Sequence, residues 1–384
     1  MKFSHPKLRI LSFAVLLTFI SLTANAQDGM ERWQNFDFAK SALKQADVAK
    51  VPLKDLTLMR GIIFGRHGRV FKDATIKTYL EAQDWYKPNP DFQNLMLNAT
   101  ERNNLDLTRV AEASKHETVQ PGDMRYWRTR TLTPRKLGKH SGAEWLVLRS
   151  EIEAIHGKRF ESDPWLQQYF DERYWYKPGK YDPKSLSAIE QKNLATITLA
   201  QKRSRKIALA PGDMELFENR LITAQMLYGL SLYELRLLRN EVYARHGRSF
   251  QAPWLAQYFF SQPWYQPDDN FKDEQLSGSD KTNVETIVAY ETKIHDDLSR
   301  KPVTRSLLEG LFVEDASQMR QEIYARRGKV FKEPWLQKYF SSFAWYKADP
   351  NFTDAQLTDL EKRNIATIAT YEKKAVSAAS VIEG

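Results

Sequence analysis

The stretch Val242-Tyr-Ala-Arg-His-Gly-Arg248 decides the fold, because variants of it occur three more times along the chain. The closest variant is Ile323-Tyr-Ala-Arg-Arg-Gly-Lys329, and looser ones are Ile63-Phe-Gly-Arg-His-Gly-Arg69 and Ile152-Glu-Ala-Ile-His-Gly-Lys158. Their glycines are 89, 90 and 81 residues apart. Similarity at a nearly fixed period of this size is typical of tandem structural repeats.

Each copy continues with the same residue types at nearly the same distances. A phenylalanine comes three residues after the glycine, a Trp-Tyr pair comes 17 or 18 residues after it, and an acidic residue then stands three before an asparagine. The positions are Phe71, Phe160, Phe250 and Phe331, then Trp85-Tyr86, Trp175-Tyr176, Trp264-Tyr265 and Trp345-Tyr346, then Glu101/Asn104, Glu190/Asn193, Asp280/Asn283 and Glu361/Asn364.

A lead-in segment belongs to each repeat as well. Pro121-Gly-Asp-Met124 and Pro211-Gly-Asp-Met214 lie 90 residues apart, whereas the fourth copy lacks this tetrapeptide and has a trimmed linker near Lys301. We therefore divide the chain into a leader at 1–26 and four repeats at 27–119, 120–209, 210–299 and 300–384.

The pattern in the third copy predicts three helices per repeat. Apolar residues at helical spacing predict an amphipathic first helix from about Leu232, which ends where Gly247 can adopt a left-handed conformation. Pro253 suits the first position of a short second helix. Ser279 or Asp280 then caps a third helix. We expect a mainly α, tandem array of four small modules, whose thin cores share apolar surface with their neighbours.

The N-terminus has the layout of a secretory signal peptide. Basic residues at positions 2, 7 and 9 precede an apolar stretch at 10–20, and small residues before Gln27 suit cleavage after Ala26. No later stretch is apolar enough to be a transmembrane segment. We therefore expect a periplasmic or extracellular protein.

Composition limits the function classes. The chain has no cysteine, so thiol nucleophiles, thiolate metal sites and redox motifs are excluded. Its formal net charge is +9, of which three charges belong to 1–26, which leaves about +6 on the mature chain. This basic excess favours an anionic envelope polymer or an envelope protein as partner, and export argues against nucleic acid.

The motif set resembles the YARHG domain, a bacterial extracellular module of about this length. The resemblance rests on Tyr243-Ala-Arg-His-Gly247 with Leu238-Arg-Asn-Glu241 before it, on Trp264-Tyr-Gln-Pro267, and on Asp280 with Asn283. The third copy matches best, the fourth nearly as well, and the first two are degenerate. The resemblance implies an accessory module of exported proteins and no particular reaction.

The residues that we assign to the structural motif are those of the third and fourth copies. They are Arg239, Tyr243, His246, Gly247, Trp264, Tyr265, Asp280, Asn283, Arg320, Tyr324, Arg327, Gly328, Trp345, Tyr346, Glu361 and Asn364.

A histidine occupies one position in three copies, as His67, His156 and His246, which would suit a general base. Arg327 replaces it in the fourth copy and cannot serve as a base, because arginine stays protonated. A donor that bonds the carbonyls at the helix end, beside the capping glycine, explains the position better.

An arginine stands eight residues before the glycine in all four copies, as Arg60, Arg149, Arg239 and Arg320. If its face of the helix is buried, the guanidinium needs a partner, because burying an unpaired charge is costly. We predict the bridges Arg239–Asp280 and Arg320–Glu361. The alternative is that these arginines grip a carboxylate or phosphate on a ligand.

The Trp-Tyr pairs suit core aromatics with polar tips, or platforms for sugar rings. Better candidates for a binding surface are basic residues close to the motif, whose weak contacts would add up over the copies. These are Arg245, Arg248, Arg326, Lys329, Arg66 and Arg69.

The sequence favours an exported, non-catalytic binding or scaffolding protein of the bacterial envelope. Its predicted partner is an anionic polymer such as peptidoglycan or surface polysaccharide, or an envelope protein. One alternative is an enzyme acting on cell-wall material through His246, Arg239 and Glu241 of the third copy, and another is a structural spacer. We assign no cofactor or metal, and the sequence leaves the oligomeric state open.

Overall fold

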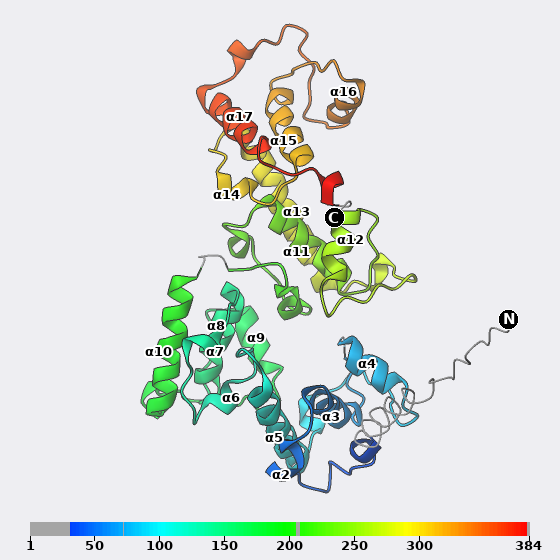
Figure 1. Ribbon diagram of the computed structural model, residues 1–384, viewed down its shortest axis with the longest axis vertical. Helices are drawn as coiled ribbons and strands as arrows, with labels where there is room; N and C mark the ends of the chain where they lie inside the picture. The colour runs from blue at the N-terminus through cyan, green and yellow to red at the C-terminus, as the bar shows by residue number, and fades with distance from the viewer. Residues whose placement is uncertain (1–30, 72, 205–207, 382–384) are drawn as a thin grey trace, which may run out of the picture. The chain divides into compact units, whose positions relative to one another are not determined.

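The computed structural model describes residues 31–71, 73–204 and 208–381. The predicted signal peptide at 1–26 therefore lies outside the described residues. All regular secondary structure in these ranges is helical, and they contain no strand (Figure 1). The predicted mainly α fold is thus confirmed. The chain forms two compact units, Met1–His116 and Glu117–Gly384.

Each repeat contains a long first helix, a short second helix and a long third helix. In the third repeat these are α11 (Leu232–Ala244), α12 (Pro253–Phe260) and α13 (Gly278–Asp296). The first two begin at the predicted residues, Leu232 and Pro253. Short 3-10 turns form the lead-in and precede the third helix, as η3 (Asp213–Phe217), η4 (Ala224–Leu227) and η5 (Asp273–Gln275).

The other repeats have the same order of elements. The first contains α2 (Gln45–Ala49), α3 (Leu53–Gly65), α4 (Ala74–Glu81), η1 (Asn94–Met96) and α5 (Ala99–Lys115). The second contains α6 (Met124–Trp127), α7 (Pro134–Leu137), α8 (Gly142–Ala154), α9 (Pro164–Asp171), η2 (Pro183–Ser185) and α10 (Ala188–Arg203). The fourth, together with the 3-10 turn η6 (Asp297–Ser299) that precedes its predicted start at residue 300, contains α14 (Arg305–Leu308), α15 (Val313–Ala325), α16 (Pro334–Ser341), η7 (Asp354–Gln356), α17 (Asp359–Glu372) and η8 (Ala378–Val381).

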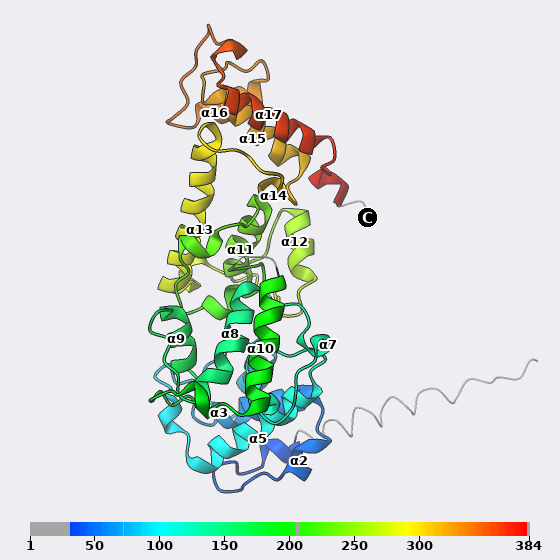
Figure 2. The same ribbon diagram turned by 90° about the vertical axis from the view of Figure 1, so that its left-hand side faces the viewer.

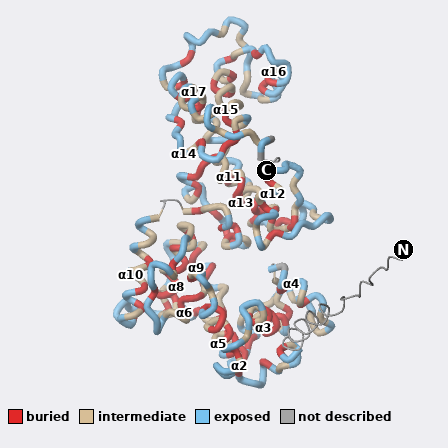
Figure 3. Tube along the Cα trace, in the orientation of Figure 1, coloured by how far each residue is buried: buried red, intermediate tan, exposed pale blue. Residues whose placement is uncertain are grey.

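The first and third helices of a repeat pack against each other, as α3 on α5, α8 on α10, α11 on α13 and α15 on α17. Buried residues concentrate on the first helices, whereas α10, α13 and α17 each bury three residues on the face toward the first helix (Figure 3). On α11, Leu235 and Leu238 are fully buried and Val242 is nearly so. The predicted apolar stripe is therefore the face that builds the core.

The third helix begins earlier than the sequence analysis placed it. Ser277, and not Ser279 or Asp280, is the N-cap of α13, and its hydroxyl accepts a hydrogen bond from the backbone N–H of Asp280. The Asp280 carboxylate in turn accepts from the backbone N–H of Ser277 at 3.0 Å. This reciprocal capping box explains the shift, because the acidic residue belongs at the fourth position of the motif and not at its start.

The glycine that ends the first helix is required by its conformation. Gly247 has φ +88°, in the left-handed region, as predicted. Its carbonyl accepts a hydrogen bond from the backbone N–H of Asp268 at 2.7 Å. A Cβ atom at Gly247 would lie 2.8 Å from the Cβ of Asp268. The turn after the helix and the segment after the Trp-Tyr pair therefore approach too closely for any side chain at this position.

Repeats 3 and 4 are joined through the helix α13. The helix α13 continues through Asp296, where the 3-10 turn η6 of the fourth repeat follows directly, and Figure 2 shows α13 running from beside α11 to the fourth repeat. One hydrophobic cluster contains Leu238 and Ile287 of repeat 3 together with Met319 and Ile368 of repeat 4. The trimmed linker that we expected near Lys301 therefore follows a helix that repeats 3 and 4 share. The expected sharing of apolar surface between neighbouring repeats is confirmed at this junction.

The second helix of one repeat contacts the next repeat at both junctions of the second unit. The Trp165 ring of α9 lies 5.0 Å from the ring of Phe217, and the Trp254 ring of α12 lies 5.1 Å from that of Phe312. Gln168 donates a hydrogen bond to the carbonyl of Asn219 at the first junction. The tryptophan that follows the helix-opening proline in repeats 2 and 3 thus packs against the next repeat.

Candidate functional site

The motif asparagine ties the lead-in to the third helix in every copy. In repeat 3, Asn283 is fully buried, its side-chain oxygen accepts from the backbone N–H of Ile222 at 2.9 Å, and its amide donates to the carbonyls of Phe217 and Arg220. The same three bonds, at the same sequence separations of 61, 66 and 63 residues, occur for Asn104, Asn193 and Asn364. This residue satisfies three backbone groups of the lead-in segment, so its role is architectural.

The motif histidine pairs with the buried acidic residue of the third helix. The ring Nε2 of His246 lies 2.9 Å from the carboxylate of Asp280, which is 4% exposed. The equivalent distances are 2.7 Å for His67–Glu101 and 3.0 Å for His156–Glu190. The predicted partner, the carbonyls at the helix end, is therefore wrong. The prediction of a donor role holds, because in repeat 4 the Arg327 Nε donates to Glu361 at 2.9 Å.

In repeats 2, 3 and 4 these pairs hold the acidic residue in its charged form. Although burial alone would raise it, the pKa of Glu190 lies at about 2, because His156, Arg128 and the backbone and side chain of Ser187 hydrogen-bond the carboxylate. The pKa values of Asp280 and Glu361 are also lowered, against the effect of burial, by His246 and Arg327 with the capping residues. The arrangement links the end of the first helix to the start of the third.

The predicted bridges Arg239–Asp280 and Arg320–Glu361 are wrong in their partner. Arg239 donates to Glu291 at 2.7 Å, and Arg320 donates to Glu372 at 2.7 Å. In both pairs the acidic partner stands 52 residues after the arginine. Arg239 lies about two turns before His246 on the first helix, so it meets the third helix at the end opposite to Asp280. The expectation that the guanidinium is paired with an acid in its own repeat is met.

This second ion pair is present in three repeats and absent from one. Arg60 pairs with Glu112 at 3.2 Å in the first repeat. In the second repeat Gln201 stands 52 residues after Arg149, so the carboxylate is missing there. The sequence signal was available: a glutamate stands eleven residues after the motif acid in repeats 1, 3 and 4.

The Trp-Tyr pair closes the turn after the first helix. The hydroxyl of Tyr265 donates to the carbonyl of Arg248 at 2.8 Å, and the same bond is made by Tyr86, Tyr176 and Tyr346. The tryptophan ring receives the motif arginine, with the guanidinium carbon of Arg245 4.2 Å from the centroid of Trp264. Arg66 on Trp85 and Arg326 on Trp345 do the same, at 3.9 and 4.6 Å. Such cation–π contacts stabilise the turn.

The glutamate two residues before the motif tyrosine supports the lead-in. The buried Glu241 accepts from the backbone N–H groups of Gly212 and Met214, and Arg245 donates to it at 2.9 Å. Burial raises the pKa of Glu241, while Arg245 and the backbone N–H groups act against the rise. In repeat 4, Glu322 instead contacts His295 and Arg326, because the end of α13 replaces the Pro-Gly-Asp-Met segment.

The candidate binding residues differ in how far they are engaged within the molecule. Arg245 contacts Glu241 and Glu215, and Arg326 contacts Glu322 and Asp296, with side chains 10% and 18% exposed. Arg66 donates to the carbonyl of Gln34 at 2.7 Å and stacks on Trp85, and Arg69 lies over Phe64. Arg248 is 42% exposed, 3.9 Å from Asp273 and over Tyr243, and Lys329 lies over Tyr324.

The three residues of the enzyme alternative do not share a partner. His246 contacts Asp280 at the start of α13, Arg239 contacts Glu291 toward its end, and Glu241 contacts the lead-in. Within the described ranges, no group of three or more His, Cys, Asp and Glu side chains is placed to hold a metal ion. No helix in the described part of the chain combines the length and the apolar character that crossing a membrane requires.

Comparison with known proteins agrees with this repeated geometry. The model of the YARHG domain matches residues 34–113, 123–202, 213–292 and 293–373, and the fourth match thus begins inside α13. Neither the curated proteins nor the solved structures gave a match to the chain. The domain is an extracellular module of uncertain function. Because the four matches cover most of the sequence and coincide with the four sets of helices, this chain belongs to the YARHG domain family.

Proposed function

We propose that this protein is a non-catalytic binding or scaffolding array of the bacterial envelope that binds an anionic polymer such as peptidoglycan or surface polysaccharide. The observation that carries the proposal is the use of the motif itself. In repeat 3, Arg245, His246, Asp280 and Asn283 all hydrogen-bond within the repeat. Because these motif side chains are engaged in contacts that stabilise the module, we assign binding to side chains that the module leaves exposed.

Charge and repetition favour a polymeric partner. The mature chain retains a basic excess of about +6 once the predicted leader is removed. A positive surface attracts anionic polymers over long range. Repeats on one chain bind a polymer at high effective concentration, so weak single contacts give a strong total. The basic residues next to each motif supply such contacts.

Among those residues, Arg248 and Lys329 are the best probes. They occupy the same position in repeats 3 and 4, directly after the motif glycine, and neither has a carboxylate closer than the 3.9 Å between Arg248 and Asp273 among the described ion pairs. Arg245 and Arg326 are unsuitable, because their removal would take the charged partner from the buried carboxylates of Glu241 and Glu322 and destabilise the repeats.

The test is co-sedimentation of residues 27–384 with purified insoluble peptidoglycan over a salt series. We expect saturable pelleting that weakens as salt rises, because ionic contacts are screened. The double variant Arg248→Ala/Lys329→Ala should pellet several-fold less. The matched control is Lys281→Ala/Lys362→Ala, which removes the same charge from exposed positions on the third helices of the same repeats.

Equal pelleting of the two double variants would remove the assignment of Arg248 and Lys329 to the binding surface. Absence of pelleting by the unmodified protein at low salt, with peptidoglycan and with acidic polysaccharide, would contradict the proposed function. An envelope protein partner, an enzyme or a spacer would then be the remaining interpretations.

A further inference from the structure

A hollow of about 670 Å³ lies where repeat 3 passes into repeat 4. Its wall includes Tyr228 from the lead-in of repeat 3, Tyr290 and Lys293 from α13, Lys301 after η6, and Leu307 from α14. The continuous helix α13 supplies one side, so the hollow is built on a rigid element. Binding sites on helices hold their side chains more firmly than sites on loops.

The floor of the hollow is apolar and its rim is aromatic. Leu298 and Val303 line it and are buried. Tyr228 is 71% exposed, although it is a large aromatic side chain. The face of an exposed tyrosine on an apolar floor suits the C–H face of a ring that carries polar groups at its edge.

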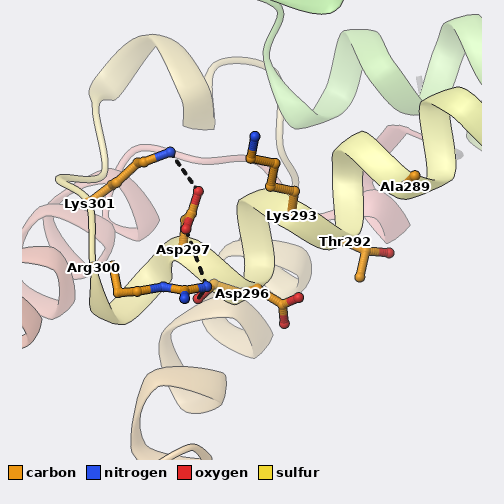
Figure 4. A pocket seen from close by; sticks show the side chains of 7 residues that line it. All are labelled: Ala289, Thr292, Lys293, Asp296, Asp297, Arg300 and Lys301. Carbon is orange, nitrogen blue, oxygen red and sulfur yellow. Dashed lines mark hydrogen bonds and ion pairs between the residues drawn. The ribbon is translucent and has the colours of Figure 1, made fainter. Parts of the chain in front are cut away.

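The rim carries an excess of positive charge. Lys301 and Arg300 both bind Asp297, at 2.7 and 3.4 Å, whereas Asp296 pairs with Arg326 at 2.9 Å, away from this group. Lys293 forms no direct ion pair or hydrogen bond among the described residues, although its charge also acts on Asp297. Figure 4, a close view of the adjoining pocket on the same stretch of chain, shows Lys293 and Lys301, which also line the hollow, with Asp297 between Lys301 and Arg300. The lining of the hollow thus carries two lysines against one carboxylate, Asp297, and this net positive charge favours an anion.

We infer that this hollow is a subsite for an acidic sugar ring of a glycan, with the ring over Tyr228 and its carboxylate between Lys293 and Lys301. The inference rests on the proposed function and names the unit of the polymer that is recognised. A free phosphate would not need the aromatic wall, and a neutral sugar would not use the unpaired lysine. Both features lie on the same hollow.

The subsite belongs to this junction and not to every repeat. The position of Tyr228, 55 residues before the motif asparagine, is Ala49, Gly138 and Glu309 in the other copies. The position of Tyr290, seven after that asparagine, is alanine in repeats 1 and 2. A polymer held weakly along the array would therefore have one point of selective contact.

The experiment is calorimetric titration of residues 27–384 at low salt with a hexamer of galacturonic acid, and with a hexamer of N-acetylglucosamine as the neutral probe. We expect saturable binding of the acidic hexamer that is at least about tenfold tighter than that of the neutral one. Tyr228→Ala and Lys293→Ala should each weaken it by about tenfold, the effect of losing roughly 1.4 kcal/mol. Lys281→Ala, on the exposed start of the same helix, should stay within about twofold.

Each variant changes an exposed side chain, and an unchanged thermal midpoint verifies that it folds. Failure of the acidic hexamer to bind, equal affinity for the neutral hexamer, or unchanged binding by both Tyr228→Ala and Lys293→Ala would overturn the subsite. If the unmodified protein still pellets with peptidoglycan in those cases, the proposed function stands and only the subsite fails.

Competition between the hexamer and insoluble peptidoglycan distinguishes two sources of the acidic ring. If the acidic hexamer releases the unmodified protein from peptidoglycan into the supernatant but does not release Tyr228→Ala, the result supports the subsite and places the recognised ring in peptidoglycan. Hexamer binding without release would support the subsite with the ring in a surface polysaccharide.

Discussion

Asn283 and its counterparts show how strictly one side chain can be constrained by backbone partners. All four copies keep asparagine with the same three hydrogen bonds, while the histidine position accepts arginine. The difference has a physical reason. An amide must both accept from one backbone N–H and donate to two carbonyls, and no other side chain of that size does so. The histidine position needs only a donor toward a carboxylate.

Replacing Asn283 by alanine should therefore lower the free energy of unfolding by about 3 kcal/mol, because a buried N–H and two carbonyls lose their partners. Urea denaturation followed by circular dichroism measures the change. The control is Asn270→Ala, at an exposed loop position of the same repeat, which should change the free energy by less than about 0.5 kcal/mol. Similar losses for the two variants would contradict the role given to Asn283.

The missing carboxylate in repeat 2 gives a prediction of the opposite sign. Gln201→Glu restores the acidic partner that Glu112, Glu291 and Glu372 provide in the other repeats. Because the site is half-buried, we expect stabilisation of about 0.5–1 kcal/mol. The gain should disappear in an Arg149→Met background, which a double-mutant cycle measures. A gain that persists without Arg149 would show that the pair is not its cause.

At the scale of elements, α13 differs from the other third helices. Its N-terminal half packs in repeat 3, and its C-terminal residues His295 and Asp296 contact Glu322 and Arg326 of repeat 4. In repeat 3 the corresponding contacts of Glu241 and Arg245 come from Gly212 and Glu215 of the lead-in. The end of α13 thus occupies the place of the lead-in loop. It contacts Glu322 and Arg326, which are equivalent to Glu241 and Arg245.

A proline at Glu285, in the middle of α13, should therefore disrupt two repeats at once. It removes a helix hydrogen bond and clashes with the preceding turn, at a cost of about 3 kcal/mol or more. Hydrogen exchange measured by mass spectrometry should rise in α11 and α13 and also in α15 and α17. The matched variant is Ala195→Pro, at the equivalent exposed position of α10, which should raise exchange in repeat 2 and leave α15 and α17 protected. Unchanged protection of α15 and α17 in Glu285→Pro would contradict a shared folding unit.

The elements themselves were largely predictable from the sequence. The helix starts at Leu232 and Pro253 and the left-handed Gly247 follow from local rules that act within a few residues. The partner of Arg239 could not be predicted in this way, because two acidic residues, Asp280 and Glu291, lie near opposite ends of the same helix, α13. The direction in which α13 packs along α11 decides between them. The join at α13 was missed because the absence of Pro-Gly-Asp-Met looked like a deletion.

At the scale of the whole molecule, the second unit contains a buried acid near the junction of repeats 2 and 3. Asp213 is 5% exposed and accepts from the backbone N–H of Ala210 at 2.7 Å. Burial, with a smaller contribution from the charges of Glu144 and Glu241, raises the pKa of Asp213 to about 7. Glu144 belongs to repeat 2, so the electrostatic state of this acid depends on both repeats.

A raised pKa makes this group stabilising when protonated. Its contribution is full below the unfolded pKa of 3.8 and is lost as the pH rises through about 7. Between pH 5.5 and pH 8 the unmodified protein should lose about 2 kcal/mol more of its free energy of unfolding than Asp213→Asn, which keeps the acceptor but cannot ionise. Chemical denaturation at both pH values measures this. Asp269→Asn, at an exposed loop position, should follow the unmodified protein, and parallel pH dependence of all three would contradict the assignment.

The unbroken helix between repeats 3 and 4 also limits how such a chain can change its length. One residue inserted into α13 turns everything after it by about 100° and advances it by about 1.5 Å. The contacts of His295 and Asp296 with Glu322 and Arg326 would then face another direction, although every local preference for helix stayed intact. An insertion or deletion inside α13 therefore reorients repeat 4 relative to repeat 3 unless its length restores the phase of the helix.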